Sequence, residues 1–140
     1  MAQHVRDIMT SAPVTVEPVA SVAAVARLMR DKGIGAVLVT DGGRLRCLVS
    51  DRDLVVRAFA DGLDPAVSTV MEAGSEHLVT VTPGDSLDRA VELMREHSVR
   101  RLPVVDENDR PVGIVSLGDL AVERDEHSAL GDISAARPNT

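Results

Sequence analysis

An internal repeat constrains the fold of this chain more than any other feature. Residues 14–41 recur as residues 79–106, and each copy opens with Val-Thr-Val-x-Pro and later reads Leu-Met-Arg. The apolar residues of both copies also keep the helical spacing i, i+3, i+4, i+7. Chance would not preserve residue identity, helix phase and the lead-in motif together. We therefore interpret the pattern as an internal duplication.

Each copy predicts the same order of elements: an extended segment, a helix, two strands and a second helix. Ser21 and Ser86 are suitable N-caps for the first helix of each copy, and Gly33 is a suitable residue to end the first of these helices. The Asp-Gly-Gly sequence at residues 41–43 predicts a hairpin. Pro103 predicts that its strand lies at a sheet edge or in an irregular position. The expected fold class is α/β (α+β), with the order β-α-β-β-α in each repeat.

The repeats also define the expected domains. Repeat 1 spans residues 5–62 and repeat 2 spans residues 63–125, whereas residues 126–140 lack a lasting period and are expected to form a loosely ordered tail. A unit of about 60 residues with so few aromatic side chains buries too little apolar surface to be stable alone. We therefore expect the repeats to pack sheet to sheet about a pseudo-twofold axis, with two equivalent clefts between them.

Composition excludes several classes of partner. The chain has 15 basic and 22 acidic residues, a net charge of −7, which argues against a broad face for duplex nucleic acid. Phe59 is the only aromatic residue, so a surface that stacks successive bases is excluded as well. No segment approaches the roughly 20 apolar residues of a membrane span, and the first residues are too polar for a signal peptide. We expect a soluble, cytoplasmic protein that binds neither nucleic acid nor membranes.

Cysteine and histidine give no pattern typical of a metal or redox site. Cys47 is the only cysteine, which indicates a reducing compartment, and we interpret it as a small buried strand residue rather than a reactive thiol. The histidines show no ligand spacing, so no metal site is predicted; they are His4, His77, His97 and His127. The chain also lacks a nucleophile elbow and a Walker loop, and we expect it not to be an enzyme.

A second repeated motif lies where the last strand of each copy meets the following helix. Ser50 and Asp53 in the first copy correspond to Ser116 and Asp119 in the second, within Ser-x-x-Asp-Leu. One interpretation is a capping box, in which the serine and the aspartate close the helix N-terminus. The other is a ligand site, in which the helix N-terminus and the serine hydroxyl hold a phosphate while the carboxylate accepts ribose hydroxyls. Both interpretations use the same geometry.

These motifs together resemble a tandem pair of CBS domains, also called a Bateman module, over roughly residues 5–125. The resemblance rests on the doubled Val-Thr-Val-x-Pro, on Arg101-Leu-Pro-Val-Val-Asp106, and on Gly113-Ile-Val-Ser-Leu-Gly-Asp-Leu120. The chain is similar to the short, stand-alone bacterial members of the family. The resemblance implies a non-catalytic sensor that binds AMP, ADP, ATP or S-adenosylmethionine between its repeats, requires no cofactor, and forms a homodimer of CBS pairs.

The resemblance also implies the residues of the ligand site. Asp53 and Asp119 would hold ribose hydroxyls, and Ser50 and Ser116 would face the phosphate. The backbone around residues 34–36 and 99–102 would line an adenine pocket. Arg100 and Arg101 would contact phosphate or, alternatively, mark a solvated strand end. The full expected set is Thr15, Val16, Ile34, Gly35, Ala36, Ser50, Asp53, Thr80, Val81, Val99, Arg100, Arg101, Leu102, Pro103, Ser116 and Asp119.

The repeats differ at the predicted site, and a second function remains open. The first copy has Gly35 and Ala36 where the second has the arginine pair, and Cys47 where the second has Gly113. The two clefts are therefore inequivalent, and one of them could be empty. The alternative function is a ligand-free module for dimerisation or for docking an unknown protein target, with a stress-related role among the options.

Overall fold

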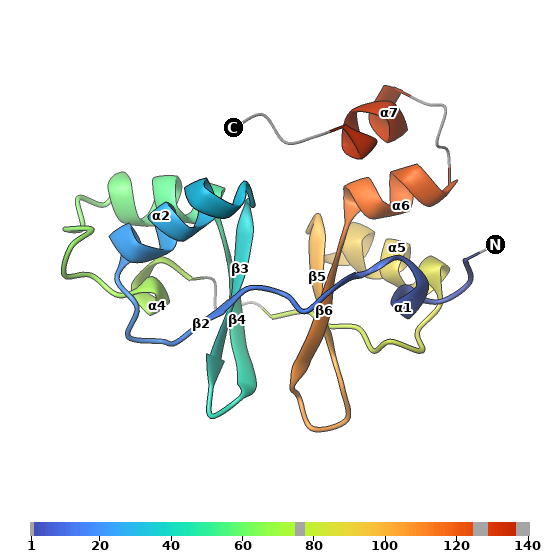
Figure 1. The fold of residues 1–140 in the computed structure, drawn as a ribbon, viewed down its shortest axis with the longest axis horizontal. Coiled ribbons are helices and arrows are strands. Elements are labelled where there is room, and N and C mark those ends of the chain that lie inside the picture. Colours follow the sequence, from blue (N-terminus) through green and yellow to red (C-terminus); the bar gives the residue numbers. More distant parts are fainter. Residues whose placement is uncertain (1, 75–77, 125–128, 137–140) are drawn as a thin grey trace. The chain divides into compact units, whose positions relative to one another are not determined.

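The described residues form two compact units. The computed structural model describes residues 2–74, 78–124 and 129–136 (Figure 1). The repeat-1 unit, as we call it, contains the described residues of the segment 14–78. The repeat-2 unit contains the described residues of 79–136 together with residues 2–13. No helix in these ranges combines the length and the apolar character that crossing a membrane requires.

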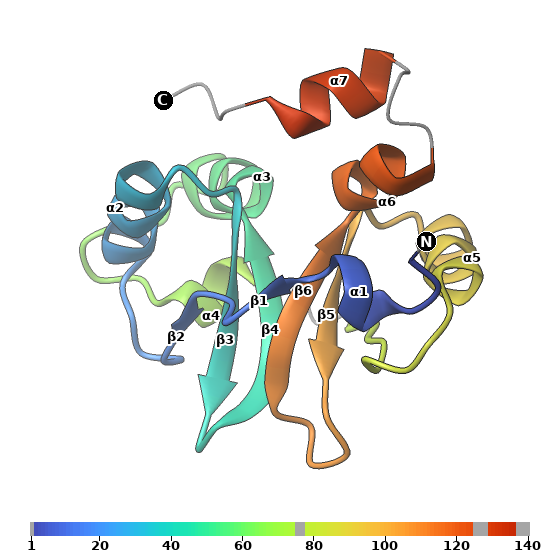
Figure 2. The same ribbon diagram turned by 45° about the vertical axis from the view of Figure 1, so that its right-hand side comes forward.

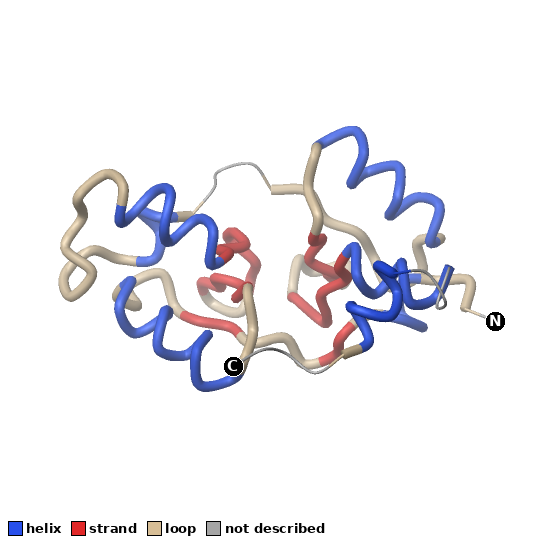
Figure 3. Tube along the Cα trace, turned by 90° about the horizontal axis from the view of Figure 1, so that it is seen from above, coloured by secondary structure: helices blue, strands red, loops and turns tan. Residues whose placement is uncertain are grey.

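The repeat-1 unit has a three-stranded sheet in the order β2-β3-β4, in which β2 pairs parallel with β3 and β3 pairs antiparallel with β4. Helices α2 and α4 lie on one face of this sheet (Figures 1 and 3). The elements are β2 Thr15–Val16, α2 Val22–Lys32, β3 Ala36–Asp41, β4 Arg44–Ser50, α3 Asp51–Asp53, the π-helix η1 Leu54–Phe59, and α4 Val70–Ala73.

The repeat-2 unit has a sheet in the order β1-β6-β5, with both pairings antiparallel (Figure 2). Val81 adds an isolated parallel bridge to β5, at the place that β2 takes beside β3. The predicted order β-α-β-β-α is therefore confirmed in both repeats. The elements are α1 Val5–Ile8, β1 Thr10–Ser11, α5 Leu87–His97, β5 Arg101–Val105, β6 Pro111–Ser116, α6 Leu117–Arg124 and α7 Ala129–Ala135.

The short helix before each repeat packs on the other repeat. Helix α1 precedes repeat 1, but Val5 is fully buried in the core of the repeat-2 unit, and β1 pairs with β6. Helix α4 precedes the core of repeat 2, but Val70 is fully buried in the core of the repeat-1 unit. The compact units thus exchange these helices, whereas the predicted division after residue 62 followed the repeats along the sequence.

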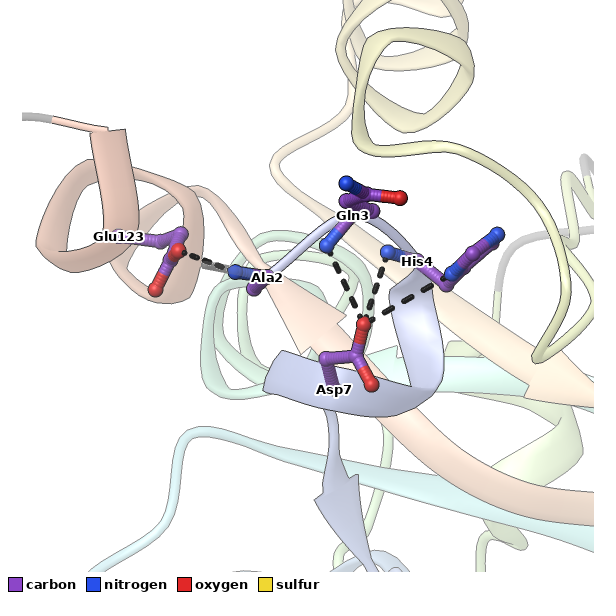
Figure 4. A network of polar contacts seen from close by, with 5 residues as sticks. All are labelled: Ala2, Gln3, His4, Asp7 and Glu123. Carbon is purple, nitrogen blue, oxygen red and sulfur yellow. Dashed lines mark hydrogen bonds and ion pairs between the residues drawn. The ribbon is translucent and has the colours of Figure 1, made fainter.

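Polar contacts hold the N-terminal segment on the repeat-2 unit (Figure 4). The N–H of Ala2 donates to Oε1 of Glu123 on α6, at 3.0 Å. Oδ2 of Asp7 accepts from the backbone N–H of His4 at 3.0 Å and from that of Gln3 at 3.2 Å. The bond from His4, followed by the one from Gln3, lowers the pKa of the Asp7 carboxyl. The exchanged helix α1 is therefore fixed at both its N-terminus and its buried valine.

The predicted local signals are confirmed. Oγ of Ser21 accepts from the N–H of Ala24 at 3.1 Å, and Oγ of Ser86 accepts from the N–H of Arg89 at 3.0 Å. The turn residues Gly42 and Gly43 have φ of 61° and 83°, as a type I′ hairpin requires. These residues act through their nearest neighbours in the chain, so the sequence alone was sufficient to place them.

Strand β5, which contains Pro103, lies at the edge of its sheet as predicted, with only the isolated bridge of Val81 on its outer side. The carbonyl of Pro103 accepts from Val81, and the N–H of Val105 donates to the carbonyl of Val81. In an antiparallel pair, the N–H and C=O of one residue point to the same side. The missing N–H of Pro103 is therefore on the side of the isolated Val81 bridge, and the pairing with β6 loses no hydrogen bond.

The end of helix α5 offers a test of local strain. Ser98 has a left-handed backbone with φ of 54°, where the first repeat has Gly33 with φ of 62°. A side chain at positive φ costs about 1–2 kcal/mol, partly offset by the greater freedom of glycine in the unfolded chain. We expect Ser98→Gly to raise the free energy of unfolding by about 0.5–1 kcal/mol, measured by urea denaturation. The matched variant Gly33→Ser should lower it, and equal signs for the two would contradict this explanation.

The second helix of repeat 1 carries four apolar residues at helical spacing, Leu54, Val55, Ala58 and Phe59, which the sequence predicts as its buried face, but only two of them are buried. Leu54 and Ala58 are buried at 8% and 2% exposure, but Val55 and Phe59 are 61% and 82% exposed. The segment is a π-helix, in which the N–H of Ala60 donates to the carbonyl of Val55, five residues earlier. Its wider turn leaves a single i, i+4 pair facing the core. The only aromatic side chain therefore lies at the surface.

The expected tail also contains a helix. Residues 129–135, placed by the sequence in a loosely ordered segment, form helix α7, which runs back antiparallel along α6 (Figures 1 and 2). Gly131 of α7 is buried. A Cβ at Gly118 of α6 would lie 3.0 Å from Oγ of Ser134. Small residues let the two helices approach closely, and the sequence pattern did not indicate this contact because it contains no apolar stripe.

Candidate functional site

The repeated Ser-x-x-Asp motif forms the same capping box in both units. In the repeat-1 unit, the N–H of Ser50 donates to Oδ2 of Asp53 at 2.8 Å, and Oγ of Ser50 accepts from the N–H of Asp53 at 3.1 Å. In the repeat-2 unit, Ser116 and Asp119 make the same two bonds at 2.8 and 3.1 Å. The capping interpretation is therefore confirmed. One oxygen of each carboxylate is used by the cap, and the other can face a ligand.

Two arginines lie beside the box of the repeat-2 unit. Arg101 pairs with Ser116 across β5 and β6, so their side chains lie on the same face of the sheet. The carbonyl of Arg100 accepts from the N–H of Leu117, the first residue of α6, at 2.8 Å. Neither guanidinium forms an ion pair with a residue that the structure describes. The backbones of both arginines therefore lie beside the N-terminus of α6.

The first turn of α6 is suited to an anion. Its box uses the N–H of Asp119, and Arg100 accepts from the N–H of Leu117. Among the described residues, no side chain accepts from the N–H of Gly118, which lies between them. The helix dipole and the arginine pair both favour an anion at this corner. It can bind a phosphate or a carboxylate.

The corresponding corner of the repeat-1 unit is occupied by its own carboxylates. Oδ1 of Asp51 accepts from the N–H of Arg52, at the position that corresponds to Gly118. Oδ1 of Asp53 lies 3.7 Å from Nε of Arg57, whereas Glu123 takes the place of this arginine in the second repeat. Gly35 and Ala36 replace the arginine pair. At this corner Arg57 already faces the carboxylate of Asp53, and the negative charge of Asp51 would repel a phosphate.

The other predicted site residues divide between the two units. Thr15 and Val16 lie on β2, and Ile34, Gly35 and Ala36 lie at the corner between α2 and β3. In the second repeat, Thr80 and Val81 precede α5, Val99 follows it, and Leu102 and Pro103 lie on β5. Val81 and Leu102 are 1% and 0% exposed in the core, so only their backbone atoms could reach a ligand.

The sequence did not predict an apolar groove that lies between α5 and α6. It has a volume of about 280 Å³ and includes one predicted residue, Val99. The remaining lining residues are Val91, Met94, Arg95, Leu117 and Leu120. Leu117 is 42% exposed and directly follows the capping serine Ser116. An apolar residue at this position was the only feature of the repeated motif that pointed to an apolar surface here. The groove therefore begins beside the positive corner of α6.

Cysteine and histidine have no metal-binding arrangement in the part of the chain that the structure describes. Cys47 is 2% exposed on β4, and burial raises the pKa of its thiol, as expected for a structural residue. No group of three or more His, Cys, Asp or Glu side chains in the described ranges could hold a metal ion. His77 and His127 lie outside these ranges.

The fold and the two capped corners define a protein made of two β-α-β-β-α repeats. A family model described as "CBS domain" matches residues 5–59 and again residues 67–126. The chain therefore belongs to the CBS-domain family and is a CBS pair, the regulatory module of that family. The family resemblance drawn from the motifs is confirmed.

Two bacterial relatives match almost the full length of the chain. The CBS domain-containing protein YhcV of Bacillus subtilis (strain 168) is 41% identical over 127 residues, which cover 91% of this chain and 89% of YhcV. Hypoxic response protein 1 of Mycobacterium tuberculosis is 36% identical over 131 residues, which cover 93% of this chain and 91% of that protein.

Solved structures show the same fold. The crystal structure of Hypoxic Response Protein I with two coordinated zinc ions has a TM-score of 0.77 and 36% identity, covering 88% of this chain and 99% of that one. The CBS domain pair of protein MJ0100, in complex with 5′-methylthioadenosine and S-adenosyl-L-methionine, has a TM-score of 0.79. Its identity is 23%, and the match covers 89% of this chain and 98% of that chain. At this low identity, the comparison with the MJ0100 pair shows a shared fold only.

Proposed function

We propose that this CBS pair is a non-catalytic sensor of an adenosine-containing ligand that carries a phosphate, and that the ligand binds at the first turn of α6. The phosphate would accept from the N–H of Gly118 and pair with Arg100 and Arg101. The second carboxylate oxygen of Asp119 would accept the ribose hydroxyls. Binding would then regulate the protein through a difference in affinity between two arrangements of the module.

The observation that carries this proposal is the contrast between the two corners. Both corners have the same capping box, but only α6 combines the open N–H of Gly118 with the arginine pair. A purely structural cap would not require this difference. The adenosine ligands of the MJ0100 pair support the choice of an adenosine compound. The arginine pair beside α6 supports a phosphorylated one.

The test is thermal unfolding of the pure protein against AMP, ADP, ATP, NAD and S-adenosylmethionine. A ligand present at about 100 times its Kd adds ~2.7 kcal/mol to the stability of the native state. For a chain of this length, this corresponds to a rise in Tm of roughly 6–12 °C. We expect a dose-dependent rise with at least one phosphorylated ligand, and a smaller rise with adenosine itself.

A matched pair of variants locates the site. Asp119→Asn keeps an oxygen that can accept from the N–H of Ser116, so the cap survives, but it removes the charge that orients the ribose. We expect at least a tenfold loss of affinity for AMP, measured by calorimetry. Asp53→Asn makes the same change at the other corner and should leave the affinity unchanged. Equal losses in both variants, or none in a folded Asp119→Asn protein, would refute the proposed site.

The second candidate is a ligand-free module for dimerisation. It is favoured by exposed apolar side chains on a helix of each unit, namely Val55 and Phe59 on η1 and Leu117 on α6. Absence of stabilisation by all five compounds at millimolar concentration, together with a stable dimer in analytical ultracentrifugation, would support this candidate over the sensor.

A further inference from the structure

Helix α7 covers the part of α6 to which the proposed ligand site belongs. A Cβ at Gly118 would lie 3.0 Å from Oγ and 3.2 Å from Cβ of Ser134, and 3.6 Å from Oγ of Ser116. Residues of α7 and of the capping box therefore surround the same point on the first turn. The antiparallel course of the two helices brings the last turn of α7 over the beginning of α6 (Figure 2).

The attachment of α7 relies on small residues. Gly131 is buried and Ser134 contacts Gly118, but the two large apolar side chains of α7 remain about half exposed or more. Leu130 and Ile133 are 49% and 72% exposed. Burial of a leucine or isoleucine side chain contributes about 1.5–3 kcal/mol, and α7 gains little of this stabilisation. Helix α7 therefore packs closely on α6 but is held there by little free energy. A segment held this weakly can be displaced by a ligand.

We infer that α7 is an autoinhibitory lid on the α6 corner. When docked, it lies beside Gly118 and hinders the approach of a phosphate to that N–H. Binding of the ligand and docking of α7 then exclude one another, so the ligand releases the helix. This inference rests on the proposed function for the position of the ligand, but the covering of the corner by α7 can be measured without any nucleotide.

The first experiment compares two tryptophan variants on adjacent positions of α7. Ser134→Trp places a large side chain against Gly118 and should undock the helix, whereas Ile133→Trp places it on the exposed face and should not. If α7 is docked in about nine molecules of ten, undocking makes AMP bind about tenfold more tightly. We expect this gain for Ser134→Trp and none for Ile133→Trp. In the unmodified protein, saturating AMP should also speed amide exchange in residues 129–135.

The second experiment needs no nucleotide. Ser116→Cys places a thiol at the corner, and an anionic methanethiosulfonate reagent reports its accessibility, since the native Cys47 is 2% exposed. We expect the added Ser134→Trp change to raise the labelling rate several-fold and Ile133→Trp to leave it unchanged. Equal labelling rates for Ser116→Cys with Ser134→Trp and for Ser116→Cys with Ile133→Trp would overturn the lid. Faster labelling, together with no AMP binding to the unmodified protein, would retain the lid and reject the proposed function.

Discussion

Replacing Val5 with alanine is expected to destabilise the protein by about 2–3 kcal/mol, although the residue lies near the N-terminus. Val5 has 0% exposure and belongs to the core of the repeat-2 unit, with which helix α1 packs. Truncating it removes buried methyl groups and leaves a cavity that the surrounding strands cannot close. The loss should appear in urea denaturation and as a fall in Tm of several degrees.

The internal repeat supplies the controls. Val70 is the counterpart of Val5 on helix α4 and also has 0% exposure, so Val70→Ala should cost a similar amount. Val19 and Val67 are 76% and 75% exposed, and their alanine variants should change stability by less than about 0.5 kcal/mol. A loss for Val5→Ala no greater than that for Val19→Ala would mean that the N-terminal helix does not form part of this core.

The second large effect is expected at two glycines where the exchanged segments cross the sheets. A Cβ at Gly113 of β6 would lie 2.5 Å from Sδ of Met9 and 3.0 Å from the carbonyl oxygen of Thr10. In the repeat-1 unit, a Cβ at Gly74 would lie 2.9 Å from Sγ of Cys47 on β4. The two units make this contact in opposite ways. In the repeat-2 unit the strand has Gly113 and the crossing segment has Met9, whereas in the repeat-1 unit the strand has Cys47 and the crossing segment has Gly74.

Both glycines should therefore resist substitution. We expect Gly113→Ala and Gly74→Ala each to lower the free energy of unfolding by about 1–3 kcal/mol, because overpacking forces the crossing segment away from its strand. Gly113→Ala should be the more severe, since the backbone of Thr10 cannot move aside as a side chain can. Denaturation of each purified variant measures the loss.

A control and a double-mutant cycle make this prediction specific. Gly84→Ala should be nearly neutral, since a Cβ there would meet only Nη1 of Arg6, at 3.7 Å. Combining Gly74→Ala with Cys47→Ala removes the sulfur that the new methyl group would meet, so the double variant should lose less stability than the sum of the single losses. Strict additivity would show that Cys47 and the crossing segment do not compete for space.

Much of the local structure followed from neighbouring residues. The caps of Ser21 and Ser86 and the hairpin at residues 41–43 depend on contacts within a few positions, which the sequence displays directly. The two capping boxes were predicted for the same reason. The π-helix was not predicted, because the apolar residues of Leu-Val-Val-Arg-Ala-Phe fit either turn width and only packing selects which of them face the core.

The candidate site was predicted in part. The repeated Ser-x-x-Asp motif and the arginine pair located the corner of α6, and the replacement of these arginines by Gly35 and Ala36 predicted that the two corners differ. Asp51, whose carboxylate accepts from the N–H of Arg52, makes the two corners differ further, and this bond could be seen only in the folded structure. The approach of Ser134 to Gly118 joins segments that share no motif, so no pattern could indicate it.

The duplication, the order of the elements, the caps and the membership of the CBS family could all be predicted from the sequence. Each of these depends on residue identity and on spacing over short distances. Three features could be seen only in the folded protein: α1 and α4 each pack with the other repeat, Phe59 is exposed, and α7 covers α6. These outcomes depend on which surfaces fit together, and the free energy of that fit comes from contacts between residues far apart in the chain.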